Sequence, residues 1–241
     1  MMKTSVTVLL FSCLSLATIE SSAQFKLPKL PIKSNNSGVT SDEAGRGIKE
    51  ALTQGVTTAV LNLNKTDGFF GSEVYKMFLP PDAVKIENTL RKAGMGAQVD
   101  KAILAINRGA EDAVAYAKPI FVDAIKEMTF ADALNILKGN KDAATQYFKQ
   151  KTTEKLIAAF TPSVKTSLDK VEATKYYADM VNTYNKFPTT FKKINPDLPS
   201  YVVGKAVDAL FDQVAREEAN IRANPIARTS DLMKKVFGSK I

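Results

Sequence analysis

The polar residues of this sequence that could do chemistry are carboxylates, arginines and tyrosines, because the chain contains no histidine. Two carboxyl groups on either side of a glycosidic bond can cleave it, and their separation decides the stereochemical outcome. No two acids of this chain stand at a spacing that is diagnostic of such a pair. An enzymatic or small-ligand site is therefore one hypothesis, and its candidate residues are Arg108, Glu111, Asp132, Asp142, Thr145, Tyr147 and Arg228.

The first helix of the central segment 128–153 explains some of these residues without chemistry. Thr129, followed three positions later by Asp132, has the pattern of an N-terminal capping box. Gly139 suits the end of this helix, where a glycine often takes a positive φ. The residues that we expect to face inward recur at helical spacing: Phe130, Ala133, Leu134 and Leu137.

The second helix of this segment has local explanations as well. We expect Asn140 to cap it, with Asp142 in the first turn, where the helix dipole favours a negative charge. We expect Tyr147 to be a core aromatic residue. Because each residue type is explained locally, we favour caps and core packing over a ligand site at Asp132, Asp142, Thr145 and Tyr147.

Segment 98–118 has the clearest amphipathic pattern in the chain. The polar residues expected to lie off its apolar stripe are Asn107, Arg108, Glu111 and Asp112. Arg108 can pair with Glu111 and Asp112 at helical spacing. If Arg108 or Arg228 is buried, we expect it to have a carboxylate partner, since an unpaired buried charge is costly.

The residue types exclude several classes of function. Cys13 is the only cysteine, and histidine and tryptophan are absent. A Ser-His-Asp or Cys-His catalytic device and a histidine-ligated metal site therefore cannot be built. Neither a calcium-binding loop of the EF-hand type nor a P-loop motif occurs. We predict no catalytic residue, no metal and no cofactor, and we regard enzymatic activity as uncertain.

The N-terminus has the pattern of an export signal. Lys3 precedes the mostly apolar run 5–17, and Ala23 ends a stretch of small residues that suits cleavage. We therefore expect residues 1–23 to be a signal peptide and the protein to be exported to the periplasm or envelope of a Gram-negative bacterium. The alternative is a lipoprotein anchored at Cys13, which we disfavour because bulky Phe11 stands nearby. Residues 24–39 then form a Pro- and Lys-rich linker.

Residues 40–238 are predicted to form one all-α domain, a bundle of about eight to ten helices. Thr40 and Glu43 form a capping box for a helix reaching Asn64, and Gly55 near its buried face either admits a neighbouring helix or is a tolerated defect. Further helices are expected at 81–93, 153–171, 173–186, 201–223 and 230–237. We expect Ile157 to face inward, Asp197 to cap the helix at 201–223 with Pro199 at an early position, and Ser230 to cap the last helix. Within them, Pro162 should kink or interrupt its helix, and Glu218 should pair with Arg222. Segment 75–79 is expected to be extended.

The basic charge is concentrated in one part of the chain. The net charge is +8, and the span 138–193 holds eleven lysines and five acids. We favour a solvated lysine-rich face, with anionic lipid headgroups or an envelope protein as alternative partners. The span has no arginine and few aromatic residues for base stacking, and together with export this argues against nucleic acid.

Several ordered motifs carry a resemblance to a known family. They are the ranges 47–52, 65–69, 89–96, 107–111, 117–121, 142–148, 195–198 and 224–232. In these motifs the chain resembles the exported bacterial proteins that share the domain of unknown function 4197, over about Asp42 to Gly238. The resemblance implies a helical exported domain and no reaction. Our first hypothesis is thus a non-enzymatic binding or scaffold module of the envelope. The alternatives are a site built from core carboxylates, arginine and tyrosine, or anionic-lipid binding.

Overall fold

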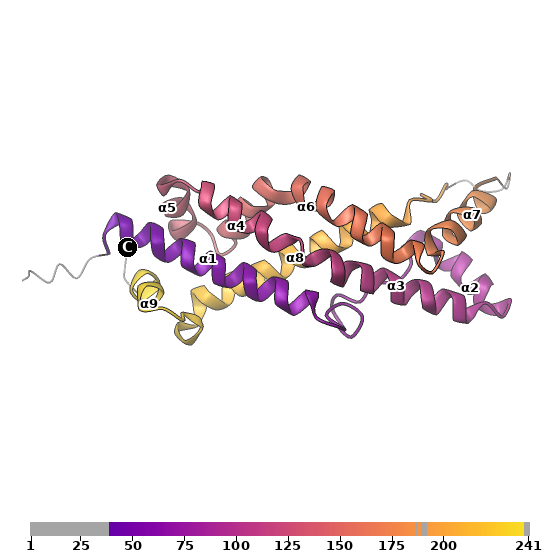
Figure 1. The fold of residues 1–241 in the computed structure, drawn as a ribbon, viewed down its shortest axis with the longest axis horizontal. Coiled ribbons are helices and arrows are strands. Elements are labelled where there is room, and N and C mark those ends of the chain that lie inside the picture. Colours follow the sequence, from indigo (N-terminus) through magenta and orange to yellow (C-terminus); the bar gives the residue numbers. More distant parts are fainter. Residues whose placement is uncertain (1–38, 187, 189–191, 239–241) are drawn as a thin grey trace, which may run out of the picture. The chain divides into compact units, whose positions relative to one another are not determined.

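A computed structural model describes residues 39–186, 188 and 192–238. The expected signal peptide, Cys13 and all but the last residue of the expected linker lie outside these described residues. In the described part the chain forms nine α-helices and two short 3₁₀ helices, with no strand, which confirms the all-α prediction (Figure 1). The elements are α1 (Ser41–Asn64), η1 (Pro81–Ala83), α2 (Val84–Lys92), α3 (Gly96–Val114), α4 (Ala117–Glu127), α5 (Phe130–Lys138), α6 (Ala143–Asp169), α7 (Ala173–Lys186), α8 (Leu198–Ala223), η2 (Pro225–Ala227) and α9 (Asp231–Gly238).

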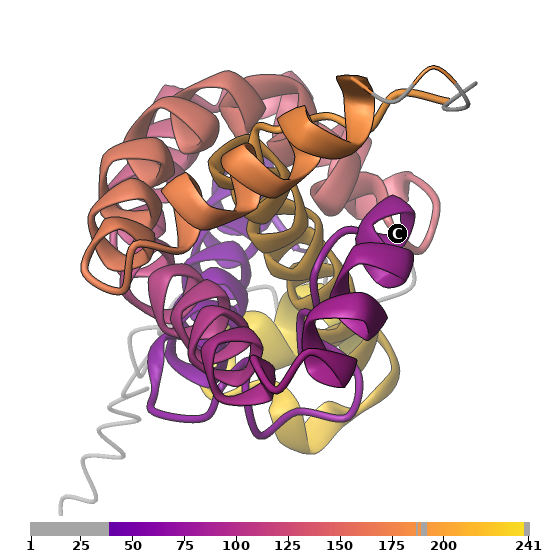
Figure 2. The same cartoon turned by 90° about the vertical axis from the view of Figure 1, so that its right-hand side faces the viewer.

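Helix α8 lies at the centre of the bundle, as the end-on view shows (Figure 2). It packs against α1, α3, α6 and α7. It starts at Leu198, three residues before the predicted start at 201, and it has the predicted cap: Asp197 accepts a hydrogen bond from the Ser200 amide and Pro199 occupies the first turn. A helix surrounded in this way needs apolar residues on more than one face, and α8 buries eleven of its 26 residues.

Helix α6 buries every fourth residue along its whole length. These residues are Ala144, Phe148, Thr152, Leu156, Phe160, Val164 and Leu168. Four residues turn a helix by about 40° more than one full turn, so the buried stripe winds around α6. Near its start α6 contacts α4, where the Phe121 and Phe148 rings lie 5.0 Å apart. Near its end it contacts α3, where Ser167 donates a hydrogen bond to the Ala105 carbonyl.

The bounds of two predicted helices are corrected. The helix predicted at 153–171 is the later part of α6, which continues through Pro162 without interruption. The helix predicted at 98–118 ends at Val114, and α4 starts at Ala117 with Pro119 in its first turn. There proline lacks only an amide that has no helical partner in any case.

Two residues that were expected to face the core are exposed. Phe130 is 46% exposed and Ile157 is 43% exposed. Phe130 is the first residue of α5 and lies at the edge of its contact with α1, where a Cβ on Gly45 would be 3.6 Å from the Phe130 ring. Ile157 lies beside the winding stripe of α6. Gly139 also differs from expectation, because its φ is −76°. Glycine suits that position by its size instead, since a Cβ there would lie 2.5 Å from the Asn135 carbonyl oxygen.

Candidate functional site

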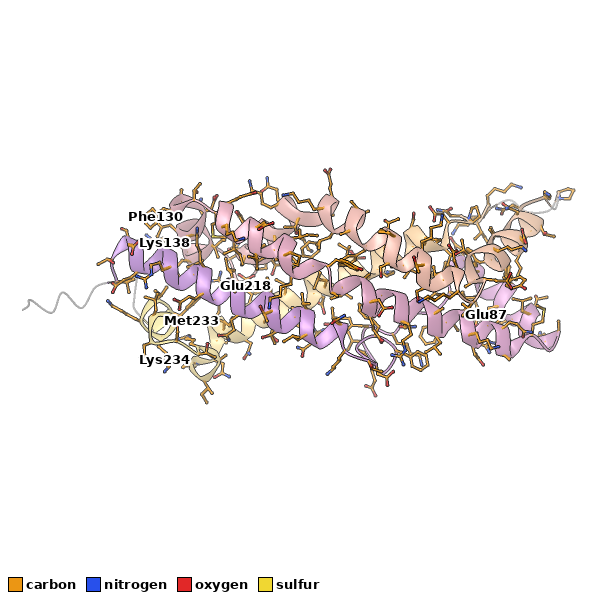
Figure 3. The ribbon with its side chains drawn as sticks, viewed as in Figure 1. Glu87, Phe130, Lys138, Glu218, Met233 and Lys234 are labelled. Carbon is orange, nitrogen blue, oxygen red and sulfur yellow. The ribbon has the colours of Figure 1, made fainter. Side chains whose placement is uncertain are left out.

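The strongest polar cluster of the bundle is built around Glu218, on the buried side of α8 (Figure 3). Its carboxylate accepts hydrogen bonds from the backbone amides of Ala144 and Thr145, at 3.0 and 2.9 Å, and from the Thr145 hydroxyl at 2.8 Å. These amides belong to the first turn of α6, where no earlier carbonyl can accept them. Glu218 therefore caps α6 from another helix, and its negative charge meets the positive end of the helix dipole.

Arg222 completes this cluster. Its guanidinium donates to Glu218 at 2.8 and 3.1 Å, which agrees with the pair predicted from the sequence. It also donates to the Ile136 carbonyl at 2.7 Å, near the end of α5. The cluster thus joins the end of α5, the start of α6 and the C-terminal part of α8 in one network. A buried charge is tolerated when it is paired and fully hydrogen-bonded in this way.

The predicted cap of α6 is wrong. Asp142 stands at the N-cap position in place of Asn140, and its side chain makes no capping hydrogen bond. The Asp142 carboxylate instead accepts from the Gln146 amide group at 3.0 Å, a hydrogen bond that lowers its pKa. Sequence reasoning missed Glu218 as the cap, although a glutamate on the buried side of its helix was a signal for such a role.

A second cluster surrounds Glu111 of α3. This carboxylate is 3% exposed and accepts hydrogen bonds from the Phe69 and Phe70 amides, both at 3.1 Å. Arg108 donates to Glu111 at 2.5 Å and to Asp67 at 2.8 Å. These hydrogen bonds, first that to Glu111 and then that to Asp67, raise the pKa of Arg108 and keep it charged. The cluster holds the loop after α1 against α3.

Asn107 holds the same connection one turn earlier. Its side chain is fully buried, accepts from the Met77 amide at 2.9 Å and donates to the Met77 carbonyl at 2.8 Å. The Asn107 side chain thereby satisfies both backbone polar groups of a buried residue that lies outside any helix. The expectation that Asn107 and Glu111 lie off the buried face of this helix is therefore wrong. Both face a connecting segment that covers α3.

Arg228 closes the end of α8. It is 8% exposed and donates to the carbonyls of Ile221 and Arg222, at 3.1 and 2.9 Å. Its guanidinium carbon lies 5.7 Å from the centre of the Phe237 ring. The expectation of a carboxylate partner for a buried arginine is wrong for Arg228. The carbonyls at the end of a helix carry enough partial negative charge to take that place.

The two remaining candidates serve local structure. Asp132 and Thr129 form the predicted capping box, with the Thr129 hydroxyl donating to Asp132 at 2.7 Å and lowering its pKa. Tyr147 donates its hydroxyl to the Ala124 carbonyl at 3.1 Å, and partial burial raises its pKa. Among the seven candidates, the structure brings Arg108 and Glu111 into direct contact. It places Asp132, Asp142, Thr145, Tyr147 and Arg228 at other helix ends and contacts.

A small apolar hollow lies beside Glu218. It has a volume of about 30 Å³ and is lined by residues of α1, α5, α6, α8 and α9. A cavity of this size has room for about two water molecules and for no metabolite. Within the described residues, no group of three or more acidic side chains stands close enough to hold a metal ion. Among the described helices, none combines the length and the hydropathy of a membrane span.

Comparison with known proteins gives one match. A family model described as "Protein of unknown function (DUF4197)" matches residues 38–238. No curated protein and no solved structure matches the chain. The matched range includes all nine described α-helices and the Glu111, Glu218 and Arg228 contacts.

Proposed function

We propose, from the premise that the chain belongs to the family of proteins of unknown function DUF4197, that it is an exported binding or scaffold module of the cell envelope and not an enzyme. Membership of this family implies no particular reaction. The support for a non-catalytic role is the way in which the two buried carboxylates, Glu111 and Glu218, are used by the fold.

A general acid, base or nucleophile must exchange a proton or a bond with a substrate within hydrogen-bonding distance. Glu218 accepts hydrogen bonds from two backbone amides, one hydroxyl and a guanidinium. Glu111 accepts from two amides and a guanidinium. Carboxylates bound in this manner stabilise helix ends and loops. Their removal should therefore change stability before it changes any activity.

Crosslinking in intact cells tests the proposal. The full chain, with a C-terminal affinity tag, is crosslinked in growing cells and recovered from the envelope fraction. We expect one or a few envelope components to be captured in a fixed ratio. A protein that is always recovered as an uncrosslinked monomer with no bound molecule would contradict a binding or scaffold role.

Export has its own test. The expected cleavage after Ala23 predicts that the protein recovered from the envelope begins at Gln24. N-terminal sequencing of that protein measures the cleavage site directly. Recovery in the cytosol with Met1 or Met2 intact would refute export, and a lipid attached to Cys13 would favour the anchored alternative.

Anionic lipid is the second candidate partner. All eleven lysines in the span 138–193 are exposed, and most of them lie on α6 and α7. Each lysine near an anionic surface contributes about 1 kcal/mol at moderate salt. We expect co-sedimentation with phosphatidylglycerol vesicles that weakens as salt is added, and none with phosphatidylcholine vesicles.

A charge reversal at three exposed lysines of α6, K149E, K155E and K165E, should abolish this sedimentation. The matched control reverses three exposed lysines outside the span, K101E, K118E and K126E. Equal losses in the two triple variants would show that net charge matters and that the lysine-rich span does not. Binding that is indifferent to anionic lipid and to salt would remove this candidate.

A further inference from the structure

An open groove of about 550 Å³ lies between α3 and α6, beside the end of α1. We call it the α3–α6 groove. Its polar lining includes Asn64, Asp112, Tyr116, Ser163 and Lys170. Its volume falls within the range of about 300–1,000 Å³ that is usual for small-molecule sites. None of the clusters around Glu111, Glu218 and Arg228 contributes a side chain to it.

The wall of this groove is held firmly. At Gly109, α3 approaches α6 so closely that a Cβ atom would lie 3.0 Å from Ser167 Cβ. Ser167 also donates its hydroxyl proton to the Ala105 carbonyl. On the other side, Asn64 donates to the Glu111 carbonyl at 2.8 Å, which fixes the end of α1. A groove formed in this way needs little reorganisation to accept a ligand.

Several polar groups in the groove have no partner within the described part of the chain. The side chains of Asp112 and Lys170 make no hydrogen bond or ion pair there, and the hydroxyl of Tyr116 makes none. Tyr116 is 54% exposed, so a large part of its ring is open to a ligand. A free carboxylate, a free ammonium group and an open aromatic ring thus line the α3–α6 groove.

Pro162 leaves a backbone acceptor next to the groove. Pro162 lies inside α6 and lines the groove, and the acceptor is the carbonyl of Ala158, the residue bonded to the lining residue Ala159. Because proline has no amide hydrogen, the Ala158 carbonyl lacks its helical donor. The Thr166 hydroxyl already donates to the Pro162 carbonyl at 2.9 Å, so that hydroxyl offers a ligand only its lone pairs. The α6 side of the groove is therefore rich in acceptors.

We propose that the α3–α6 groove binds a short saccharide. A sugar ring has an apolar face that fits the exposed ring of Tyr116, and its hydroxyls both donate and accept. The hydroxyls donate to Asp112 and to the Ala158 carbonyl, and they accept from Lys170. A dipeptide would pair with the charged side chains of Asp112 and Lys170. It would offer fewer contacts than a saccharide to the Ala158 carbonyl and to the Tyr116 ring. This inference goes beyond the proposed function, because it depends neither on export nor on the lysine-rich span.

NMR titration of the purified full chain with cellobiose and with N,N′-diacetylchitobiose tests the proposal. We expect saturable shifts at Tyr116 and Ser163 with at least one of the two disaccharides. Alanyl-alanine serves as the zwitterionic comparison and should produce no saturable shift there. Saturation by alanyl-alanine alone, or by none of the three probes at millimolar concentration, would overturn the proposal.

Two variants make the test specific to the groove. Y116A should weaken saccharide binding at least about fivefold, in keeping with the value of one aromatic contact. Its matched control is Y176A, which removes a tyrosine of similar exposure, 50%, that lies on α7 and outside the groove. Equal affinities of the two variants, with circular dichroism showing both to be folded, would overturn the proposal.

P162A gives the Ala158 carbonyl a helical donor and should weaken binding a few-fold while the helix remains intact. Unchanged affinity in P162A would remove the carbonyl from the proposal and contradict it in this form. Release of monosaccharide during the titration would support the groove as a saccharide site and contradict the non-catalytic proposed function. The two proposals can therefore fail separately.

Discussion

At the scale of single residues, Glu218 performs the task that a local N-cap usually performs. The first turn of α6 leaves amides without acceptors, and the residue at its N-cap, Asp142, does not reach them. Glu218 supplies both oxygens from α8, and Arg222 balances the charge. A cap of this kind also fixes how two helices lie against each other, which a cap from the same helix cannot do.

The first prediction concerns this cap. Glu218→Gln should destabilise the protein by about 3 kcal/mol, because it leaves Arg222 without its counter-charge and turns an amide group toward amide donors. Urea unfolding followed by circular dichroism measures the change. The matched control is Glu154→Gln on the exposed face of α6, which should change the unfolding free energy by less than about 0.5 kcal/mol. Similar values for the two variants would contradict a structural role for Glu218.

The second prediction concerns Glu43, at the start of α1. Hydrogen bonds from Lys235, and then from Thr40, lower the pKa of Glu43 from 4.5 to about 2. A carboxyl group with a lowered pKa in the folded state stabilises the protein above pH 4.5, and this contribution is lost as the pH falls toward 2. NMR titration of the Glu43 carboxyl carbon should therefore show a midpoint well below 4.5.

Lys235→Met removes the largest cause of that shift and should move the Glu43 midpoint upward. Lys234→Met is the control, because Lys234 pairs with Asp231 and not with Glu43. An unchanged Glu43 midpoint in Lys235→Met would show that the contact between α9 and α1 does not persist in solution.

The third prediction concerns Asn107. Asn107→Ala leaves the Met77 amide and carbonyl without partners and should cost about 2–4 kcal/mol. Hydrogen exchange at the Met77 amide should also become faster, because the segment before η1 loses its attachment to α3. Asn88→Ala, an exposed asparagine of α2, is the control and should have little effect on either measurement. Slow exchange at the Met77 amide in Asn107→Ala would show that Asn107 does not hold this segment against α3.

At the scale of secondary structure, the sequence predicted elements whose signals are local. The capping boxes at Thr40 and Thr129 and the caps at Asp197 and Ser230 start helices where they were expected. Helix α6 was divided wrongly because its apolar residues recur every four positions, so no single face of the helix is apolar throughout. A stripe that winds around a helix is buried only when several other helices surround that helix. The sequence does not show the order of those helices in space.

The fourth prediction follows from Pro162, which does not end α6. Its neighbours keep the helix intact although the Ala158 carbonyl loses a hydrogen bond. Pro162→Ala restores that hydrogen bond at an exposed site and should stabilise the protein by about 1–3 kcal/mol. Thr161→Ala, the adjacent exposed residue, is the control, with an expected gain of at most about 0.7 kcal/mol. Destabilisation by Pro162→Ala would show that α6 bends at this point and that the bend is needed.

At the scale of the whole molecule, the candidate site was harder to predict than the fold. The capping box of Asp132 joins it to Thr129, only three positions away in the chain, and it was predicted correctly. The contacts of Thr145, Glu111 and Arg228 depend on packing between distant segments: α6 with α8, α3 with the loop after α1, and the end of α8 with α9. Residue type alone could therefore identify them as unusual, but it could not assign the partner that explains each one.

The same limit applies to two of the three glycines of α1, Gly47 and Gly55. Gly55 was singled out in the sequence as a point of close approach, yet a Cβ there would lie 3.6 Å from Ile221, an ordinary contact. Gly47 makes the close approach, because a Cβ there would lie 2.6 Å from Val236 of α9. Both glycines are buried in the same helix, so they differ only in what packs against them.

One substitution at these two positions should therefore have opposite effects. Gly55→Ala should stabilise the protein by about 0.5–1 kcal/mol, because alanine favours a helix and meets no obstacle. Gly47→Ala should lose that gain and cost about 1–3 kcal/mol, because Val236 must move and α9 must shift on α1. Urea unfolding measures both changes, and hydrogen exchange in Gly47→Ala should become faster in α9 before it does in α3 or α6. If both variants are stabilised and α9 keeps its protection, the last helix does not close against the first as the structure describes.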